Sequence, residues 1–220
     1  LRIARLPGSS RHRSHLISTI ARECARRGDH EQGRTIAAGL GDDALRRSVA
    51  TDAALEAAEA GRTDQSWQWL KLIEERQKRD EARAKVVTTW LESREKPPNP
   101  ERLAEIREMA DAMRTPAYRA DILFALADAQ LEAGRNAGAG RVADNLLDLG
   151  NARYIREFDH RMANLMIRLG RDGEARRFFR EAVEEARRIA CGSCRRETFQ
   201  SLQSDMVQAG LADLAVKLLG

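Results

Sequence analysis

The sequence predicts an all-α fold, an α-solenoid of about six antiparallel helix pairs. One observation is the spacing of the glycines at 28, 61, 134, 170 and 210. Their intervals are 33, 73, 36 and 40 residues, so all but one of them are close to a single period. The other is that apolar residues on both sides of each glycine recur at helical spacing, while no segment alternates like a strand. Two helices around each turn cannot bury their apolar faces alone, so stacking of the pairs should form the core.

One turn of this series is made by prolines. The interval of 73 residues is about twice 36, which predicts a further turn near position 97. There the sequence reads SREKPPNPERL, and its three prolines break a helix. We therefore expect a single helical-repeat domain over 1–220. Its six repeats are 12–41, 42–79, 80–114, 115–150, 151–190 and 191–220.

The ends of the predicted helices have recognisable residues. Each turn glycine suits a left-handed C-cap. The residue five positions later is small, which should let the second helix approach the first; these residues are Gly33, Ser66, Ala139, Ala175 and Ala215. Four polar residues are expected as N-caps of second helices: Thr63, Asn99, Asn136 and Asp172.

Composition limits the class of protein. A content of 42% hydrophobic and 33% charged residues is typical of a folded protein whose helices each bury one face. No apolar run approaches the roughly 20 residues that span a bilayer, and no signal-peptide pattern is present. Three cysteines are too few for a disulfide framework. We expect a cytoplasmic protein without a membrane span. The first residues, RIARLPGSSRHRSHL, look like the inter-repeat segment RRIACGSCRRETF, so we also expect a fragment of a longer protein.

A resemblance to a known repeat family covers nearly the whole chain and is best in the fifth repeat. The spacing of Ala163, Gly170, Ala175, Phe179 and Ala182 resembles the tetratricopeptide repeat. The resemblance implies a right-handed superhelix that binds a partner in its concave groove. HEAT-like stacking is the alternative, and the short period argues against it.

The groove that this resemblance implies is lined by the first helix of each repeat. We expect a peptide or helix of a partner protein there, with basic residues in the N-terminal half and acids in the C-terminal half. The candidate groove residues are His15, Arg22, Lys85, Thr88, Asp121, Phe124, Asp128, Glu157, His160, Asn164 and Gln200. The function predicted is that of a non-enzymatic scaffold or adaptor.

A second function, binding of an anionic polymer such as nucleic acid, follows from the arginines. Arginine makes up 33 of the 38 basic residues, and five arginines precede the first acid, Glu23. An arginine also lies fifteen residues before most turns, at 13, 46, 83, 119 and 195, with Ile155 as the exception. The favoured interpretation is structural: these arginines bind carbonyls or carboxylates that end the previous helix. A ladder for an anionic ligand is the alternative.

Catalytic signatures are absent from the sequence, which predicts no enzyme, no cofactor and no metal site. Cys191 and Cys194 in CGSC form a candidate redox pair, since a basic segment at a helix start should lower both thiol pKa values. The βαβ context of redox dithiols is missing, which favours an incidental loop. Trp67 and Trp69 are two residues apart, so one should be buried and the other partly exposed. Packing of the exposed tryptophan against a neighbouring repeat is slightly favoured, and a role for Trp67 or Trp69 as an anchor for a partner is the alternative.

Overall fold

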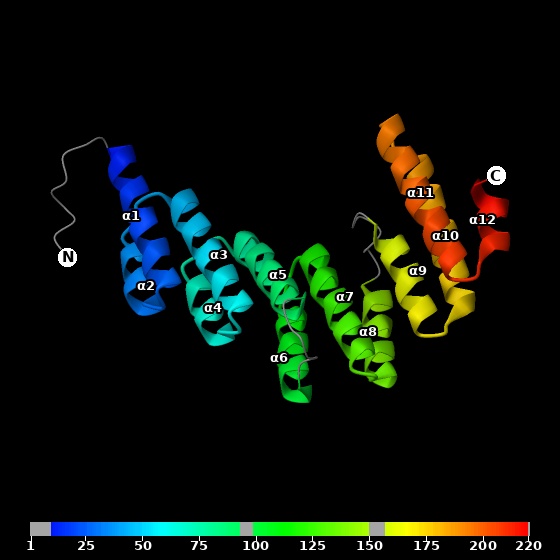
Figure 1. Ribbon diagram of the computed structural model, residues 1–220, viewed down its shortest axis with the longest axis horizontal. Coiled ribbons are helices and arrows are strands. Elements are labelled where there is room, and N and C mark those ends of the chain that lie inside the picture. Colours follow the sequence, from blue (N-terminus) through cyan, green and yellow to red (C-terminus); the bar gives the residue numbers. More distant parts are fainter. Residues whose placement is uncertain (1–9, 93–98, 150–156, 220) are drawn as a thin grey trace. The chain divides into compact units, whose positions relative to one another are not determined.

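The computed structural model describes residues 10–92, 99–149 and 157–219, which form twelve α-helices and contain no strand (Figure 1). This confirms the all-α prediction. The helices are α1 Ser10–Arg26, α2 His30–Ala38, α3 Asp43–Glu59, α4 Thr63–Leu70, α5 Arg76–Glu92, α6 Pro100–Asp111, α7 Pro116–Glu132, α8 Asn136–Asp148, α9 Phe158–Arg168, α10 Asp172–Arg187, α11 Gly192–Gln208 and α12 Ala212–Leu219. Within the described ranges, no helix is long and apolar enough to cross a membrane.

The chain divides into two compact units, described separately below. Unit 1 comprises Leu1–Lys96 and Met113–Tyr118, and unit 2 comprises Pro97–Ala112 and Arg119–Gly220. In unit 1, α1 packs on α2 and α3, and α3 packs on α4 and α5. In unit 2, α10 packs on α9 and α11, and α11 packs on α12. In both units, helices that are neighbours in the sequence pack together. In unit 1, α3 also packs on both α1 and α5.

The five turn glycines have the predicted left-handed conformation, with φ between 68° and 88°. Their hydrogen bonds close each helix in a Schellman motif. After α9, for example, the Gly170 amide donates to the Ile167 carbonyl at 2.9 Å, and the Arg171 amide donates to the Met166 carbonyl at 2.8 Å. A side chain at φ near 70° would be strained, which explains why glycine recurs at these turns.

The predicted N-caps are right at one position and one residue late at the others. The Asn99 side chain accepts the Arg102 amide at 2.9 Å and caps α6. Thr63, Asn136 and Asp172 are instead the first residues of α4, α8 and α10. In those three turns the arginine that follows the glycine is the N-cap. After the Schellman bonds the next helix begins directly behind this arginine, one residue earlier than predicted.

Small residues allow the close helix contacts that were predicted. A Cβ atom on Gly33 would lie 3.0 Å from the Ala21 carbonyl oxygen of α1. Ser66, Ala139 and Ala175 are fully buried. The predicted difference in burial between the two tryptophans is also confirmed, since Trp69 is buried and Trp67 is partly exposed.

Candidate functional site

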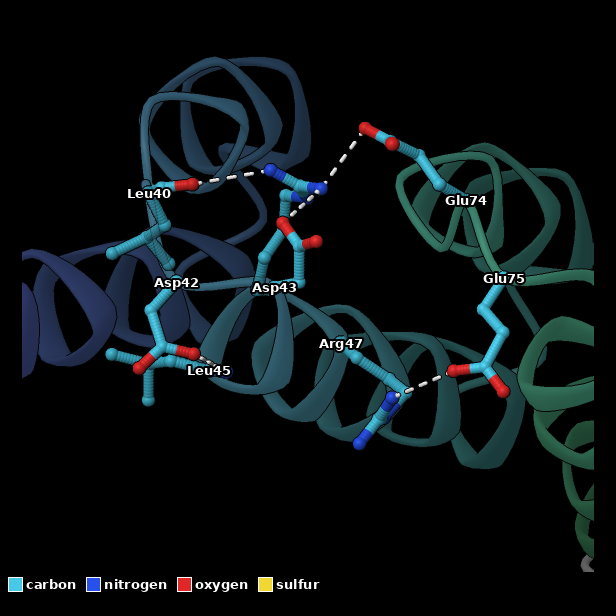
Figure 2. Close-up of polar contacts among 8 residues, drawn as sticks. Leu40, Asp42, Asp43, Leu45, Arg47, Glu74 and Glu75 are labelled. Atoms are coloured by element: carbon cyan, nitrogen blue, oxygen red, sulfur yellow. Dashed lines mark hydrogen bonds and ion pairs between the residues drawn. The ribbon is translucent and has the colours of Figure 1, made fainter.

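The periodic arginines occupy one structural position, the fourth residue of each odd-numbered helix. At α3 this residue is Arg46, whose side chain is only 13% exposed. Its guanidinium donates to the Leu40 carbonyl at 3.1 Å, to Asp43 at 2.7 Å and to Glu74 at 2.9 Å. Figure 2 shows these three acceptors around one guanidinium group. Arg46 thus joins the segment before its helix to the segment that follows α4.

Equivalent arginines bind the end of the preceding element in three further helices. Arg79 donates to the Ile73 carbonyl and Arg195 to the Ile189 carbonyl, each at 3.3 Å. The donor lies six residues after the acceptor in both, as it does for Arg46. Arg119 instead pairs with Asp111, the last residue of α6, at 2.7 Å. The structural interpretation of the repeated arginines is therefore confirmed in α3, α5, α7 and α11.

Two assignments in that series need correction. Arg79, not Arg83, has this role in α5, and Arg83 pairs with Asp80 at 3.4 Å. The fourth residue of α9 is Arg161, whereas the residue predicted from the turn, Ile155, lies outside the described residues. In α9 the series shifts because this helix has 11 residues where α3 has 17. In α5, which also has 17 residues, it shifts because the reference Pro98 lies six residues after the last helical residue, whereas Gly61 lies two residues after the end of α3.

In α9 the arginine makes different contacts. Its Nη1 binds Asp121 of α7 at 2.6 Å. Its guanidinium carbon also lies 4.1 Å from the centre of the Phe124 ring. Phe124 is buried and makes an edge-on contact with Phe158 at 5.5 Å. The arginine therefore covers an aromatic pair and holds a carboxylate from the neighbouring odd-numbered helix.

Polar contacts between odd-numbered helices continue along unit 2. Arg168 of α9 pairs with Asp128 of α7. The pKa of Asp128 is raised above its ordinary value, because burial raises it more than Arg168 lowers it. Asp205 of α11 accepts from the Asn164 amide at 2.8 Å and lies 2.6 Å from His160 Nε2. We call this surface the α7–α9–α11 face; its residues are Asp121, Asp128, His160, Arg161, Asn164, Arg168 and Asp205.

A cleft of about 410 Å³ lies between α9, α10 and α11. Its apolar lining comes from Ala182, Ala186, Ile189 and Leu202. Its polar lining comes from Glu157, His160, Glu185, Cys194 and Thr198. His160 therefore belongs to both the cleft and the α7–α9–α11 face. An apolar floor with a few polar groups at its edge is typical of a site for a side chain or a small ligand.

The structure brings together five of the predicted groove residues. Asp121, Phe124, Asp128, His160 and Asn164 contribute to the α7–α9–α11 face or its aromatic support. A sixth, Glu157, lines the cleft and has a left-handed backbone, with φ of 65°. Sequence reasoning did not include Arg168 and Asp205 in this surface. Both are charged and lie close to predicted positions, but their partners are about 40 residues away in the chain.

Gln200 lies elsewhere in unit 2. It lines a separate hollow of about 570 Å³ together with Arg187, Arg196 and Phe199, and the two hollows share no residue.

The other four predicted groove residues belong to unit 1. Arg22 of α1 binds Asp52 of α3 at 2.8 Å and also binds Ser48. Lys85 pairs with Glu81 one turn earlier in α5, at 3.0 Å. The Thr88 hydroxyl donates to backbone carbonyls of its own helix, and His15 is exposed. The contact of Arg22 is the unit 1 counterpart of the pairs between α7 and α9.

His30 forms a buried polar cluster that the sequence did not reveal. Its Nδ1 accepts the Trp69 indole N–H at 3.1 Å, and its Nε2 lies 3.2 Å from Arg62. Burial lowers the pKa of His30, and Arg62 and Arg34 lower it further. The imidazole is therefore neutral at pH 7 and links α2 to α4.

The cysteine pair lies at the start of α11. Cys191 is the N-cap residue, and its sulfur accepts the Cys194 amide at 3.3 Å. Hydrogen bonds from Cys194 and Ser193 lower the pKa of Cys191 to about 7, whereas the Cys191 thiol raises the pKa of Cys194. The prediction that both pKa values fall is therefore wrong. A hydrogen bond between two thiols lowers the pKa of the acceptor, Cys191, and raises the pKa of the donor, Cys194.

The chemistry open to these groups is limited by their placement. The described residues contain no group of three or more histidines, cysteines, aspartates and glutamates that could hold a metal ion. Cys194 and Asp205 lie about 16 Å apart along α11, so His160, which contacts Asp205, cannot also reach the cysteine. No protein-family model, curated protein or solved structure matches the chain.

Proposed function

We propose that the chain is a tetratricopeptide-like α-solenoid of antiparallel helix pairs, and that it binds an extended peptide of a partner protein without catalysing a reaction. Repeated devices support the architecture: a left-handed glycine with the same hydrogen bonds at five turns, and an arginine as the fourth residue of each odd-numbered helix described. Such features recur when each repeat packs on its neighbours through equivalent contacts.

The observation that carries the proposal is the cleft beside the α7–α9–α11 face. An apolar side chain of the peptide would enter the cleft above Ala182 and Leu202, while the peptide backbone would lie along the polar face. The ion pairs on that face are partly exposed: the side chain of Arg161 is 36% and that of Asp121 39% exposed. Pairs of this kind contribute little to stability, about 0–1 kcal/mol, so a ligand can replace one partner at small cost.

A peptide is favoured over an anionic polymer because of what the repeated arginines do. Arg46, Arg79 and Arg195 use guanidinium nitrogens on carbonyls of the chain itself. On the α7–α9–α11 face, Arg161 and Arg168 each bind a carboxylate. These contacts use part of each guanidinium's hydrogen-bonding capacity and offset its charge with acceptors of the chain itself, which disfavours phosphate binding.

The experiment uses two tryptophan substitutions on α11. Peptides would first be selected from a phage-displayed library of random dodecapeptides on the whole chain. Thr198→Trp should then block the cleft, since Thr198 lines it, and weaken the selected peptide at least about tenfold. Ser201→Trp is the matched control, because Ser201 is exposed on the same helix and does not line the cleft.

Calorimetric titration of the selected peptide into each of the two variants measures the change in affinity. Unchanged affinity in Thr198→Trp would show that the cleft is not the binding site. If instead the chain binds a single-stranded RNA oligonucleotide, with affinity falling steeply as salt is raised, the anionic-polymer alternative replaces the peptide proposal.

A further inference from the structure

The first turn of α11 holds two cysteines in contact at the protein surface. Both are exposed free thiols. Cys191 is the N-cap, and its sulfur receives the backbone N–H of Cys194 at 3.3 Å and lies 3.1 Å from the Ser193 hydroxyl. The neighbouring Cys194 side chain also lowers the pKa of the Cys191 thiol. The two sulfur atoms are therefore neighbours before any reaction takes place.

The surroundings favour a negative charge on Cys191. From 186 to 196 the chain has four arginines and no acidic residue. The N-terminus of α11 adds the positive end of a helix dipole at the same place. Hydrogen bonds from the Cys194 side chain, the Ser193 hydroxyl and the Cys194 amide lower the pKa of Cys191 to about 7, so a substantial fraction of the Cys191 thiol is thiolate at neutral pH.

We propose that Cys191 and Cys194 are a redox-active dithiol that a hydroperoxide oxidises to an intramolecular disulfide, with Cys191 as the attacking sulfur and Cys194 as the resolving one. Cys194 also lines the cleft proposed for the peptide, but the redox reaction does not depend on peptide binding. The third cysteine of the sequence, Cys24, belongs to α1.

The reaction has two steps. The Cys191 thiolate attacks one oxygen of the hydroperoxide, the O–O bond breaks, and the leaving alkoxide or hydroxide takes a proton from water. Cys191 is then a sulfenic acid. The Cys194 sulfur attacks the Cys191 sulfur, the S–S bond forms, and the S–O bond breaks with release of water that carries the Cys194 proton. The two sulfurs together lose two electrons, which the peroxide gains, and an external dithiol restores both thiols.

Each cysteine has a separate role because their pKa values differ in opposite directions. The thiolate is the nucleophile, so Cys191 should react first. The Cys194 thiol stays protonated at neutral pH and serves as the hydrogen-bond donor to that thiolate. Serine is a good N-cap residue, so Cys191→Ser should keep α11 folded.

The test treats the whole reduced chain with hydrogen peroxide and follows intact mass and peptide maps. The wild type should lose two hydrogens, with the new disulfide between Cys191 and Cys194, and dithiothreitol should restore the reduced mass. Cys194→Ser should stop at the sulfenic acid of Cys191, which dimedone traps. Cys191→Ser should show no trapping at Cys194 under the same conditions.

Alkylation gives a second measurement that is independent of the disulfide. At pH 6, iodoacetamide should modify Cys191 about sixfold faster than an unperturbed thiol such as glutathione, after allowing for the lower nucleophilicity of a less basic thiolate. The rate should rise with a midpoint near pH 7.

Three results would overturn the proposal. The first is peroxide treatment that leaves no Cys191–Cys194 disulfide. The second is an alkylation profile with its midpoint at the ordinary value of about 8.5. The third is stoichiometric zinc in the purified chain that Cys191→Ser abolishes, which would make the pair part of a metal site.

Discussion

Replacing Gly33 by alanine tests how closely the helices of unit 1 pack. Gly33 lies within α2, where a Cβ would be 3.0 Å from the Ala21 carbonyl oxygen and 3.0 Å from Cη2 and Cζ2 of Trp69. Neither neighbour has room to move, since Ala21 and Trp69 are fully buried and His30 holds the indole N–H. Alanine gains about 1 kcal/mol in helix propensity. Overpacking costs about 1–3 kcal/mol. We expect Gly33→Ala to lower the free energy of unfolding by about 1 kcal/mol.

Gly140→Ala is the matched control, because Gly140 lies within α8 and its added Cβ would have no atom within 4 Å. It should raise the free energy of unfolding by about 1 kcal/mol, the opposite sign for the same substitution. Urea unfolding measures both effects. Tryptophan fluorescence reports on unit 1, which contains all three tryptophans, and far-ultraviolet circular dichroism reports on the helices of both units together. Equal stabilisation by the two substitutions would refute the close approach of α1, α2 and α4 at Gly33.

Two further predictions concern polar groups in unit 1. Burial and Arg62 lower the pKa of His30 in the folded chain, so the unfolded chain takes up the proton first. Unfolding free energy should therefore decrease as the pH falls below about 6.5, and His30→Gln should remove that part of the decrease in urea titrations at several pH values. An identical pH dependence in the variant would contradict the assignment. Arg46→Met should cost about 1–3 kcal/mol in urea unfolding, because the Leu40 carbonyl loses its donor. Arg47→Met, which breaks only an exposed ion pair next to it (Figure 2), should change stability by less than about 0.5 kcal/mol, and equal losses would contradict the role of Arg46.

The features that could be predicted from sequence depend on neighbouring residues. The left-handed glycines follow from a backbone preference, and Asn99 caps α6 through a contact three residues away. The small residues at the helix contacts could also be predicted, because a repeat period places them at equal distances from each turn. The N-caps at Thr63, Asn136 and Asp172 were misplaced by one residue, since the length of a Schellman turn depends on hydrogen bonds that the sequence does not display.

The features that could not be predicted depend on distant packing. Asp205 was not recognised as part of the candidate surface, because its partners His160 and Asn164 lie more than 40 residues earlier. The His30 and Trp69 contact spans 39 residues and was missed for the same reason. A single sequence gives the residue type at each position, but it does not give the rotation of each helix about its axis, and that rotation selects the partners.

The arginine at the fourth position of the odd-numbered helices makes different contacts in α9 than in the other helices compared below. In α3, α5, α7 and α11 it binds the element that precedes its own helix, which serves stacking. In α9 the same position, Arg161, binds Asp121 and covers Phe124 of the preceding odd-numbered helix. A residue that has one structural role in other repeats thus contributes to a surface in this one. That surface adjoins the apolar cleft through His160, one residue earlier in α9. The departure of Arg161 from the repeat pattern and the cleft are independent observations, and both involve α9, because His160 lines the cleft.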